Sequence, residues 1–206
     1  MALKLEMKKE GIEVKKLRLS MTKVARFVVD LFWDSKEDLD GHALLAKNTG
    51  NGAKVESLDQ VLSTFNTEIP LADGSATTRK SGDKRPFKTP CGSLHHSGDA
   101  RTGVGADIDE RITIDGALIP AGVNEIPIFV TIYPTGTSNF GQVKSAGIRI
   151  KDDRGNVLGE YELSTQFGQF DAVQMGSLLL SESGWEYSPV GVGFIGEFEG
   201  ILAQFS

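Results

Sequence analysis

An alternation of apolar and polar residues at every second position constrains the fold of this chain more than any other sequence feature. Near the N-terminus, Leu3, Leu5 and Met7 alternate with lysine and glutamate, and the pattern returns between Ile12 and Met21. Because successive side chains of a strand point to opposite faces, this pattern predicts short strands with one face in solvent. The pattern recurs over residues 146–150 and 157–163, on either side of the turn at 152–156, which predicts a hairpin.

Two runs are more continuously apolar than the rest, at Arg26–Phe32 and Ile126–Tyr133, and we expect them to form central strands. Residues 172–180 and 190–195 are further strand candidates. Helical spacing occurs at the C-terminal end, in Phe198, Ile201, Leu202 and Phe205. With 24 glycines available for turns, these elements predict an all-β fold, a β-sandwich of two mainly antiparallel sheets with a short C-terminal helix.

One stretch, residues 66–95, lacks this periodicity and contains several prolines and glycines. Since apolar alternation resumes on both sides of it, we interpret it as a long irregular surface loop within a single domain that spans residues 1–206. The loop carries a basic cluster, for which a solvated loop is the default interpretation and contact with an anionic partner is the alternative. The cluster consists of Arg79, Lys80, Lys84, Arg85 and Lys88.

Composition excludes several classes of function. The chain has 206 residues, with 22 basic and 28 acidic ones, and its net charge of −6 argues against sequence-independent nucleic-acid binding. The single cysteine, Cys91, excludes an internal disulfide framework and a cysteine-rich zinc site. No apolar run approaches the roughly 18–20 residues that cross a bilayer, so we expect a cytoplasmic protein without a transmembrane segment.

Two acidic segments, residues 33–41 and 97–110, carry the most distinctive chemistry. Together they contain Asp34, Glu37, Asp38, Asp40, Asp99, Asp107, Asp109 and Glu110. Calcium binds six to eight oxygen ligands and accepts irregular loops that mix carboxylates with backbone carbonyls. If the segments converge, a cation or raised pKa values must relieve their repulsion. The alternative is that both are solvated turns, in which aspartate and glycine are common. The first segment does not fit an EF-hand, because the first and twelfth ligand positions would fall on Lys36 and Lys47.

Several motifs, in this order along the chain, make the sequence resemble the TerD family of tellurium-resistance and stress proteins. They are Phe32-Trp33-Asp34 with Asp38-Leu39-Asp40, the run from His96 to Gly105 with Asp109-Glu110, Ser138-Asn139-Phe140-Gly141-Gln142-Val143, and Gly184-Trp185 with Val190-Gly191-Val192-Gly193-Phe194. The resemblance covers nearly the whole chain. It implies a β-sandwich that binds calcium, one or two ions, on loops at one end, in a protein associated with tellurium resistance or stress response.

By that resemblance the metal ligands are Asp38 and Asp40 from the first segment, and Asp99, Asp109 and Glu110 from the second. The backbone carbonyls of Thr102 and Gly103 are further candidates. Asp34 and Asn66 also match family positions. The chain departs from the family at Ile108, where an acidic residue is typical, and Asp107 is the neighbouring substitute. Loss of a charged ligand should weaken a site, so one full-affinity site is a safer expectation than two.

Two other classes of function remain open at this point. A structural or assembly role, as a shell or virion component, would keep the fold and use a protein partner or self-assembly. An enzyme is the least favoured class, because no nucleophile and base stand in a recognisable pattern. His95 and His96 point to opposite faces of a strand, so they cannot bind one metal together, and we expect His96 to support the acidic loop.

Overall fold

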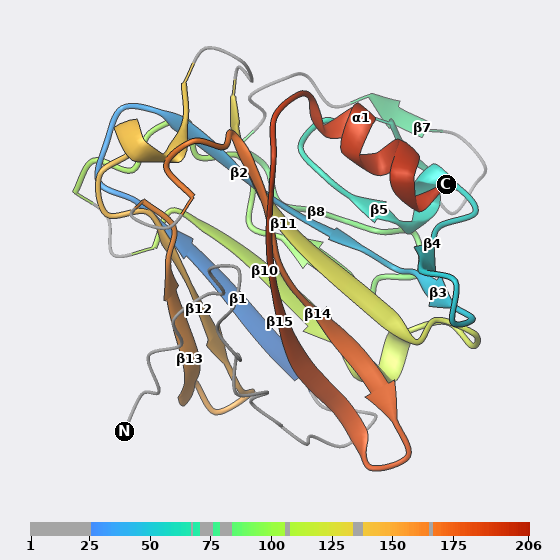
Figure 1. Cartoon of the computed structure of the whole chain (residues 1–206). Helices are drawn as coiled ribbons and strands as arrows, with labels where there is room; N and C mark the ends of the chain where they lie inside the picture. Colours follow the sequence, from blue (N-terminus) through green and yellow to red (C-terminus); the bar gives the residue numbers. More distant parts are fainter. Residues whose placement is uncertain are drawn as a thin grey trace.

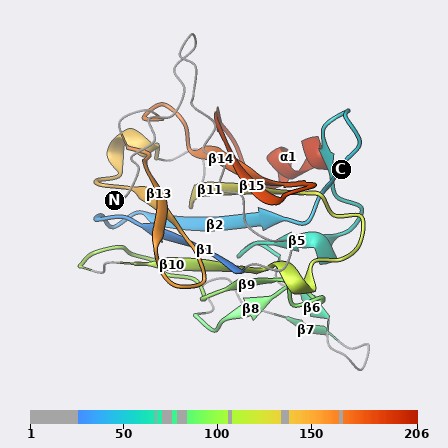
Figure 2. The same ribbon diagram turned by 90° about the horizontal axis from the view of Figure 1, so that it is seen from below.

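The computed structural model describes residues 26–66, 68–70, 76–78, 84–105, 108–133, 138–164 and 167–206. The strands predicted before residue 26 lie outside these ranges. Within them the chain forms two large antiparallel sheets, which Figure 2 shows as stacked layers. This arrangement confirms the predicted all-β sandwich.

The first sheet has six strands in the order β13–β12–β1–β10–β9–β8. The bounds, in chain order, are β1 (Arg26–Phe32), β8 (Phe87–Lys88), β9 (Leu94–His96), β10 (Glu110–Asp115), β12 (Gly147–Lys151) and β13 (Val157–Glu162). Strands β12 and β13 form the hairpin that the alternation predicts.

The second sheet has five strands in the order β15–β14–β11–β2–β5. The bounds, in chain order, are β2 (Asp38–Leu44), β5 (Val61–Leu62), β11 (Glu125–Tyr133), β14 (Ala172–Ser181) and β15 (Gly184–Phe194). Strand β15 begins six residues before the predicted start at residue 190, and its added part brings Trp185 and Tyr187 into the core. Pro189 obscures the pattern there, and it pairs with Gly176 beside a β-bulge.

Shorter elements connect the sheets. They are the strands β3 (Lys47–Asn48), β4 (Ala53–Lys54), β6 (Glu68–Pro70) and β7 (Ala76–Thr78), the helix α1 (Phe198–Leu202), and the 3₁₀ turns η1 (Leu58–Gln60), η2 (Gly116–Leu118), η3 (Phe140–Gln142) and η4 (Ala203–Phe205). The region predicted as a long irregular loop, residues 66–95, contains short strands in its described part, since β6 pairs with β7 and β8 extends the six-stranded sheet. Strands of two or three residues are too short to produce a readable alternation.

The core has two parts. Between the sheets lie apolar side chains of both layers, for example Leu31 and Ile112 from one and Ile128 and Val130 from the other. On the outer face of the five-stranded sheet, Phe198 of the C-terminal helix packs in a second cluster with β2 and β11 residues. Strand β11 is therefore buried on both faces, as its unbroken apolar run predicts, and Figure 1 shows α1 beside this sheet.

A charged triad lies on the face of β1 that points away from the inter-sheet core. Asp30 is fully buried, and its two carboxylate oxygens accept hydrogen bonds from Arg111 Nε at 2.6 Å and Lys151 Nζ at 2.5 Å. Burial alone would raise the pKa of Asp30, but these two bonds hold it below its ordinary value. The triad thereby ties β1 to both neighbouring strands.

Replacing Asp30 with asparagine should lower the free energy of unfolding by about 3 kcal/mol, because it leaves two cations around an uncharged buried group. Urea denaturation at pH 7 measures the change. Asp115→Asn is the matched control, because Asp115 of β10 forms an ion pair with Arg26 of β1 at the exposed surface. Equal effects of the two substitutions would contradict a structural role for the buried triad.

Candidate metal centre

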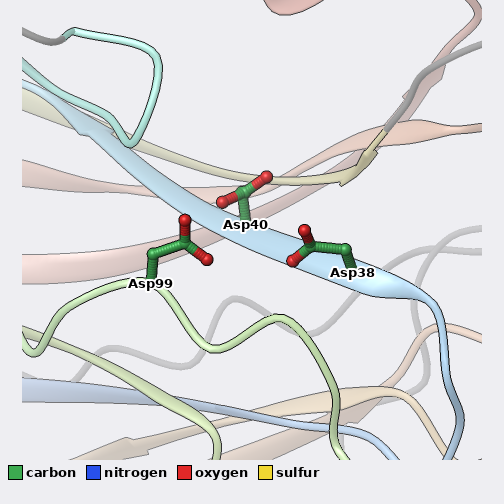
Figure 3. Close-up of side chains that lie close together, drawn as sticks. All are labelled: Asp38, Asp40 and Asp99. Atoms are coloured by element: carbon green, nitrogen blue, oxygen red, sulfur yellow. The ribbon is translucent and has the colours of Figure 1, made fainter. Parts of the chain in front are cut away.

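The acidic site is built on β2 and on the loop that follows β9. Asp38 and Asp40 occupy alternate positions of β2, so both side chains point to the same face of the strand. The loop brings Asp99 to this face, and Figure 3 shows the three carboxylates converging. The sequence therefore brings together two segments that are about sixty residues apart in the chain.

Two glycines allow the loop to approach β2 and the six-stranded sheet so closely. Gly98 has φ +111°, and a side chain there would collide with the carbonyl of Lys84. Gly103 lies against Trp33, where a Cβ atom would overlap the indole ring and the backbone oxygen. Each glycine thus has a steric role in positioning Asp99.

The geometry of the three aspartates fits one cation. One carboxylate oxygen from each of Asp38, Asp40 and Asp99 lies within 4.8 Å of the other two. Calcium–oxygen distances are about 2.3–2.6 Å, so a single ion between the carboxylates can contact all three. The cavity at this point has a volume of about 20 Å³, which is room for an ion or one water molecule.

Burial makes the negative charges of this cluster costly. Asp40 is 3% exposed, and its pKa is raised well above its ordinary value, first by burial and then by the charge of Glu110. Thr64, which also lines the cavity, acts in the opposite direction. The pKa of Asp38 is raised to about 6 by burial and by the charge of Asp99, while Arg101 opposes the shift. A divalent cation would remove this cost by neutralising the carboxylates.

Two carboxylate oxygens in the cluster lack a hydrogen-bond partner. Within the described ranges, no donor reaches Asp38 Oδ1 or Asp99 Oδ1, although both atoms are buried. Buried polar atoms in proteins are nearly always paired with protein or water. Calcium and magnesium prefer carboxylate oxygens as ligands, so a bound ion would give these two buried oxygen atoms a partner.

Glu110 lies beneath the cluster and connects the two sheets. Its Oε2 accepts a hydrogen bond from the backbone N–H of Gly41 at 2.9 Å, and its Oε1 accepts one from Ala100 at 3.1 Å. His96 Nε2 lies 3.2 Å from Oε2, and His96 Nδ1 accepts a hydrogen bond from Gly98. Since Nδ1 is an acceptor, Nε2 carries the ring proton of the neutral imidazole and faces Glu110. The structure thus gives Glu110 contacts that hold β2 and the acidic loop together, with His96 as support.

The remaining predicted ligands lie apart from the three aspartates or outside the described residues. Asp109 Oδ2 accepts a hydrogen bond from the backbone of Trp33 at 2.9 Å, and its pKa is raised, mainly by burial. Thr102 is exposed, and Gly103 is buried against Trp33. Asp107 lies outside the described part of the chain. Ligand roles for these residues remain predictions.

Asp34 and Asn66, which also match family positions, have other partners in the structure. Asp34 forms an exposed ion pair with Lys144 at 2.8 Å. The amide of Asn66 donates hydrogen bonds to the carbonyls of Leu58 and Val61 and so fixes the chain after β5.

Sequence reasoning missed several residues that line the cavity. Thr64, Phe65, Arg101 and Tyr133 surround the three aspartates. Tyr133 pairs with Asp38 in the β2–β11 register, a neighbour relationship that a single strand pattern does not reveal. Arg101 lies within the family motif around Asp99, so that motif could have identified it as a neighbour of the site. Thr64 and Phe65 follow a two-residue strand, and no sequence pattern marks them as neighbours of the site.

In a chelator, the substitution Asp38→Asn should stabilise the protein, and increasingly so as the pH rises from about 4 to about 6. A carboxyl whose pKa is raised by folding binds more protons in the folded state, so the parent loses stability as the pH rises from the ordinary value of 3.8 to about 6. Thermal melts of parent and variant in EGTA measure the difference in Tm at each pH. Asp153→Asn, on an exposed turn, is the control and should show no such trend. A difference in Tm that stays constant with pH would contradict the assigned repulsion.

Comparisons with known proteins agree with the fold and identify the family. The computed structure superposes on the crystal structure of a homologue of telluride resistance protein (TerD) from Streptomyces coelicolor with a TM-score of 0.65 and 19% identity, covering 87% of this chain and 95% of that one. In sequence, the chain is 33% identical to chemical-damaging agent resistance protein B of Clostridium acetobutylicum over 122 residues, which are 58% of this chain and 88% of that protein. It is 29% identical to tellurium resistance protein TerD of Alcaligenes over 187 residues, covering 86% and 85% of the two chains.

None of the helices in the described part of the chain has the length and apolar character needed to span a bilayer. The model of the TerD domain matches residues 1–205, so the chain belongs to the TerD family.

Proposed function

We propose that this protein is a non-enzymatic calcium-binding member of its family, with Asp38, Asp40 and Asp99 as the carboxylate ligands of one ion. The observation that carries this proposal is the convergence of three buried or half-buried carboxylates within 4.8 Å, two of them with an unpartnered oxygen. Three ionised carboxylates carry three negative charges. Among the residues that line the cavity, Arg101 is the single basic one, and it balances one of these charges. A divalent cation supplies the missing charge.

The size and lining of the cavity favour ion binding over catalysis. A volume of about 20 Å³ excludes an organic substrate from the space between the carboxylates. Its lining offers the hydroxyl groups of Thr64 and Tyr133, and neither pairs with a histidine or lysine base there. We therefore assign Glu110 and His96 a positioning role rather than an acid–base role.

The proposed biological setting comes from the relatives. Proteins similar to this chain are named for tellurium resistance and for stress response. We propose that this protein acts in the same type of response in the cytoplasm, with calcium ordering the loops at one end of the sandwich. Complementation of a tellurite-sensitive strain by the parent, but not by Asp40→Asn, would support this setting, and equal growth with both would contradict it.

Isothermal titration with calcium should give one saturable binding event per chain. Asp40→Asn and Asp99→Asn should each weaken binding by at least tenfold, because each removes a charged ligand from an ion that has few others. Asp153→Asn should leave binding unchanged. Asp109→Asn tests for a second ion. The binding event at the three aspartates should remain in this variant, and the stoichiometry should fall only if Asp109 holds another ion. No heat from the parent protein, with no change in Tm, would refute the proposal.

Calcium should also stabilise the fold by linkage. At a free concentration one hundred times the dissociation constant, the expected gain is about 2.7 kcal/mol in the free energy of unfolding. Chemical denaturation in calcium and in EGTA measures the gain, which at the same calcium concentration should fall to about 1.4 kcal/mol or less in Asp40→Asn, because its site binds at least tenfold more weakly. An equal gain in parent and variant would place the ion elsewhere.

A further inference from the structure

The C-terminal helix leaves an open apolar groove that the acidic site does not use. The groove lies between the segment 57–66 and α1, which Figure 1 shows near β5, and its volume is about 420 Å³. This volume falls in the roughly 300–1,000 Å³ range of ligand-binding clefts. Its apolar lining consists of Leu58, Val61, Phe65, Phe198 and Leu202.

The floor of the groove is buried and its rim is exposed. Val61 and Phe198 are buried, and Phe198 stacks on the ring of His42 at 4.1 Å. Phe65 also stacks on the His42 ring, at 5.4 Å, and lies 6.1 Å from Phe198. At the rim, Leu58 is 61% exposed, which is unusual for a large apolar side chain next to a concave surface. The groove is therefore preformed, and a bound apolar group would cover Leu58.

The charged residues within the two wall segments of the groove are all acidic. The two segments that form its walls, residues 55–66 and 197–206, contain four acidic residues and neither lysine nor arginine. The four are Glu56, Asp59, Glu197 and Glu199, all of them exposed, and Glu199 lines the groove itself. Lys54, the nearest cation in sequence, donates hydrogen bonds to the carbonyls of Gln204 and Ser206. An occupant must therefore be apolar in the centre and positively charged at its edges.

We infer that this groove docks a cationic amphipathic segment of a partner protein, with one or two large aliphatic side chains seated on Phe65 and Phe198. Lysine or arginine residues that flank those side chains would meet the acidic walls. Grooves that receive the apolar face of a peptide are a recurrent mode of peptide recognition. The inference does not depend on calcium, because the groove and the acidic cavity are lined by different residues apart from Phe65.

The test uses fluorescence anisotropy with a labelled synthetic peptide of leucine and lysine, titrated with the full chain at 150 mM salt. A peptide with glutamate in place of every lysine keeps the apolar pattern and reverses the charge. Saturable binding of the leucine–lysine peptide, with at least tenfold weaker binding of the leucine–glutamate peptide, is the expected result. Absence of saturation, or equal binding of both peptides, would overturn the inference.

Two substitutions locate the binding to the groove. Leu58→Ser removes the exposed rim, and Glu199→Lys reverses the charge of the lining; each should weaken binding at least fivefold. Both residues are exposed, so neither change should unfold the chain. The matched controls are Leu118→Ser, at another exposed leucine, and Glu182→Lys, on the turn between β14 and β15. Controls that weaken binding as much as the groove variants would show non-specific attraction to an acidic protein and would sink the proposal.

Discussion

Repulsion among buried carboxylates is the interaction on which the acidic end of this molecule depends. Asp40 and Glu110 are almost completely excluded from solvent, and Asp38 and Asp99 lie next to them. Burial raises the cost of each charge and also strengthens the repulsion between them, because both effects grow as the local dielectric falls. A sandwich can keep such a group only if protons or a metal ion balance the charge.

The fold imposes this crowding through a small number of contacts between its layers. Glu110 begins β10 in the six-stranded sheet, yet its carboxylate accepts a backbone N–H from Gly41 of β2 in the other sheet. Its second oxygen holds Ala100, one residue after Asp99. The same side chain therefore sets the spacing of the two ligand segments. Glu110 therefore supports the site from beneath the three converging aspartates, and His96 lies beside it.

Much of the architecture could be predicted from the sequence, because period-2 alternation directly reports a strand with two different faces. The hairpin β12–β13, the doubly buried strand β11 and the short helix α1 follow from their apolar patterns. The two-residue strand β8 and the early start of β15 could not be predicted, since one is too short for a pattern and the other contains Pro189.

For the site, a run of acidic residues identifies candidates but not their partners in space. Asp38, Asp40 and Asp99 meet, whereas the equally acidic Asp109 turns toward the backbone of Trp33. The difference depends on sheet register and on the close approach of Gly103 to Trp33, which are properties of the folded chain. Family resemblance supplied the positions, and only the packing separated ligand candidates from positioning residues.

A crystal structure of the protein grown in calcium tests the central claim most directly. We expect a single strong difference peak within about 2.3–2.6 Å of carboxylate oxygens from Asp38, Asp40 and Asp99, with both Glu110 oxygens still bound to Gly41 and Ala100. A calcium peak coordinated elsewhere, or three carboxylates held apart by water alone at saturating calcium, would contradict the account.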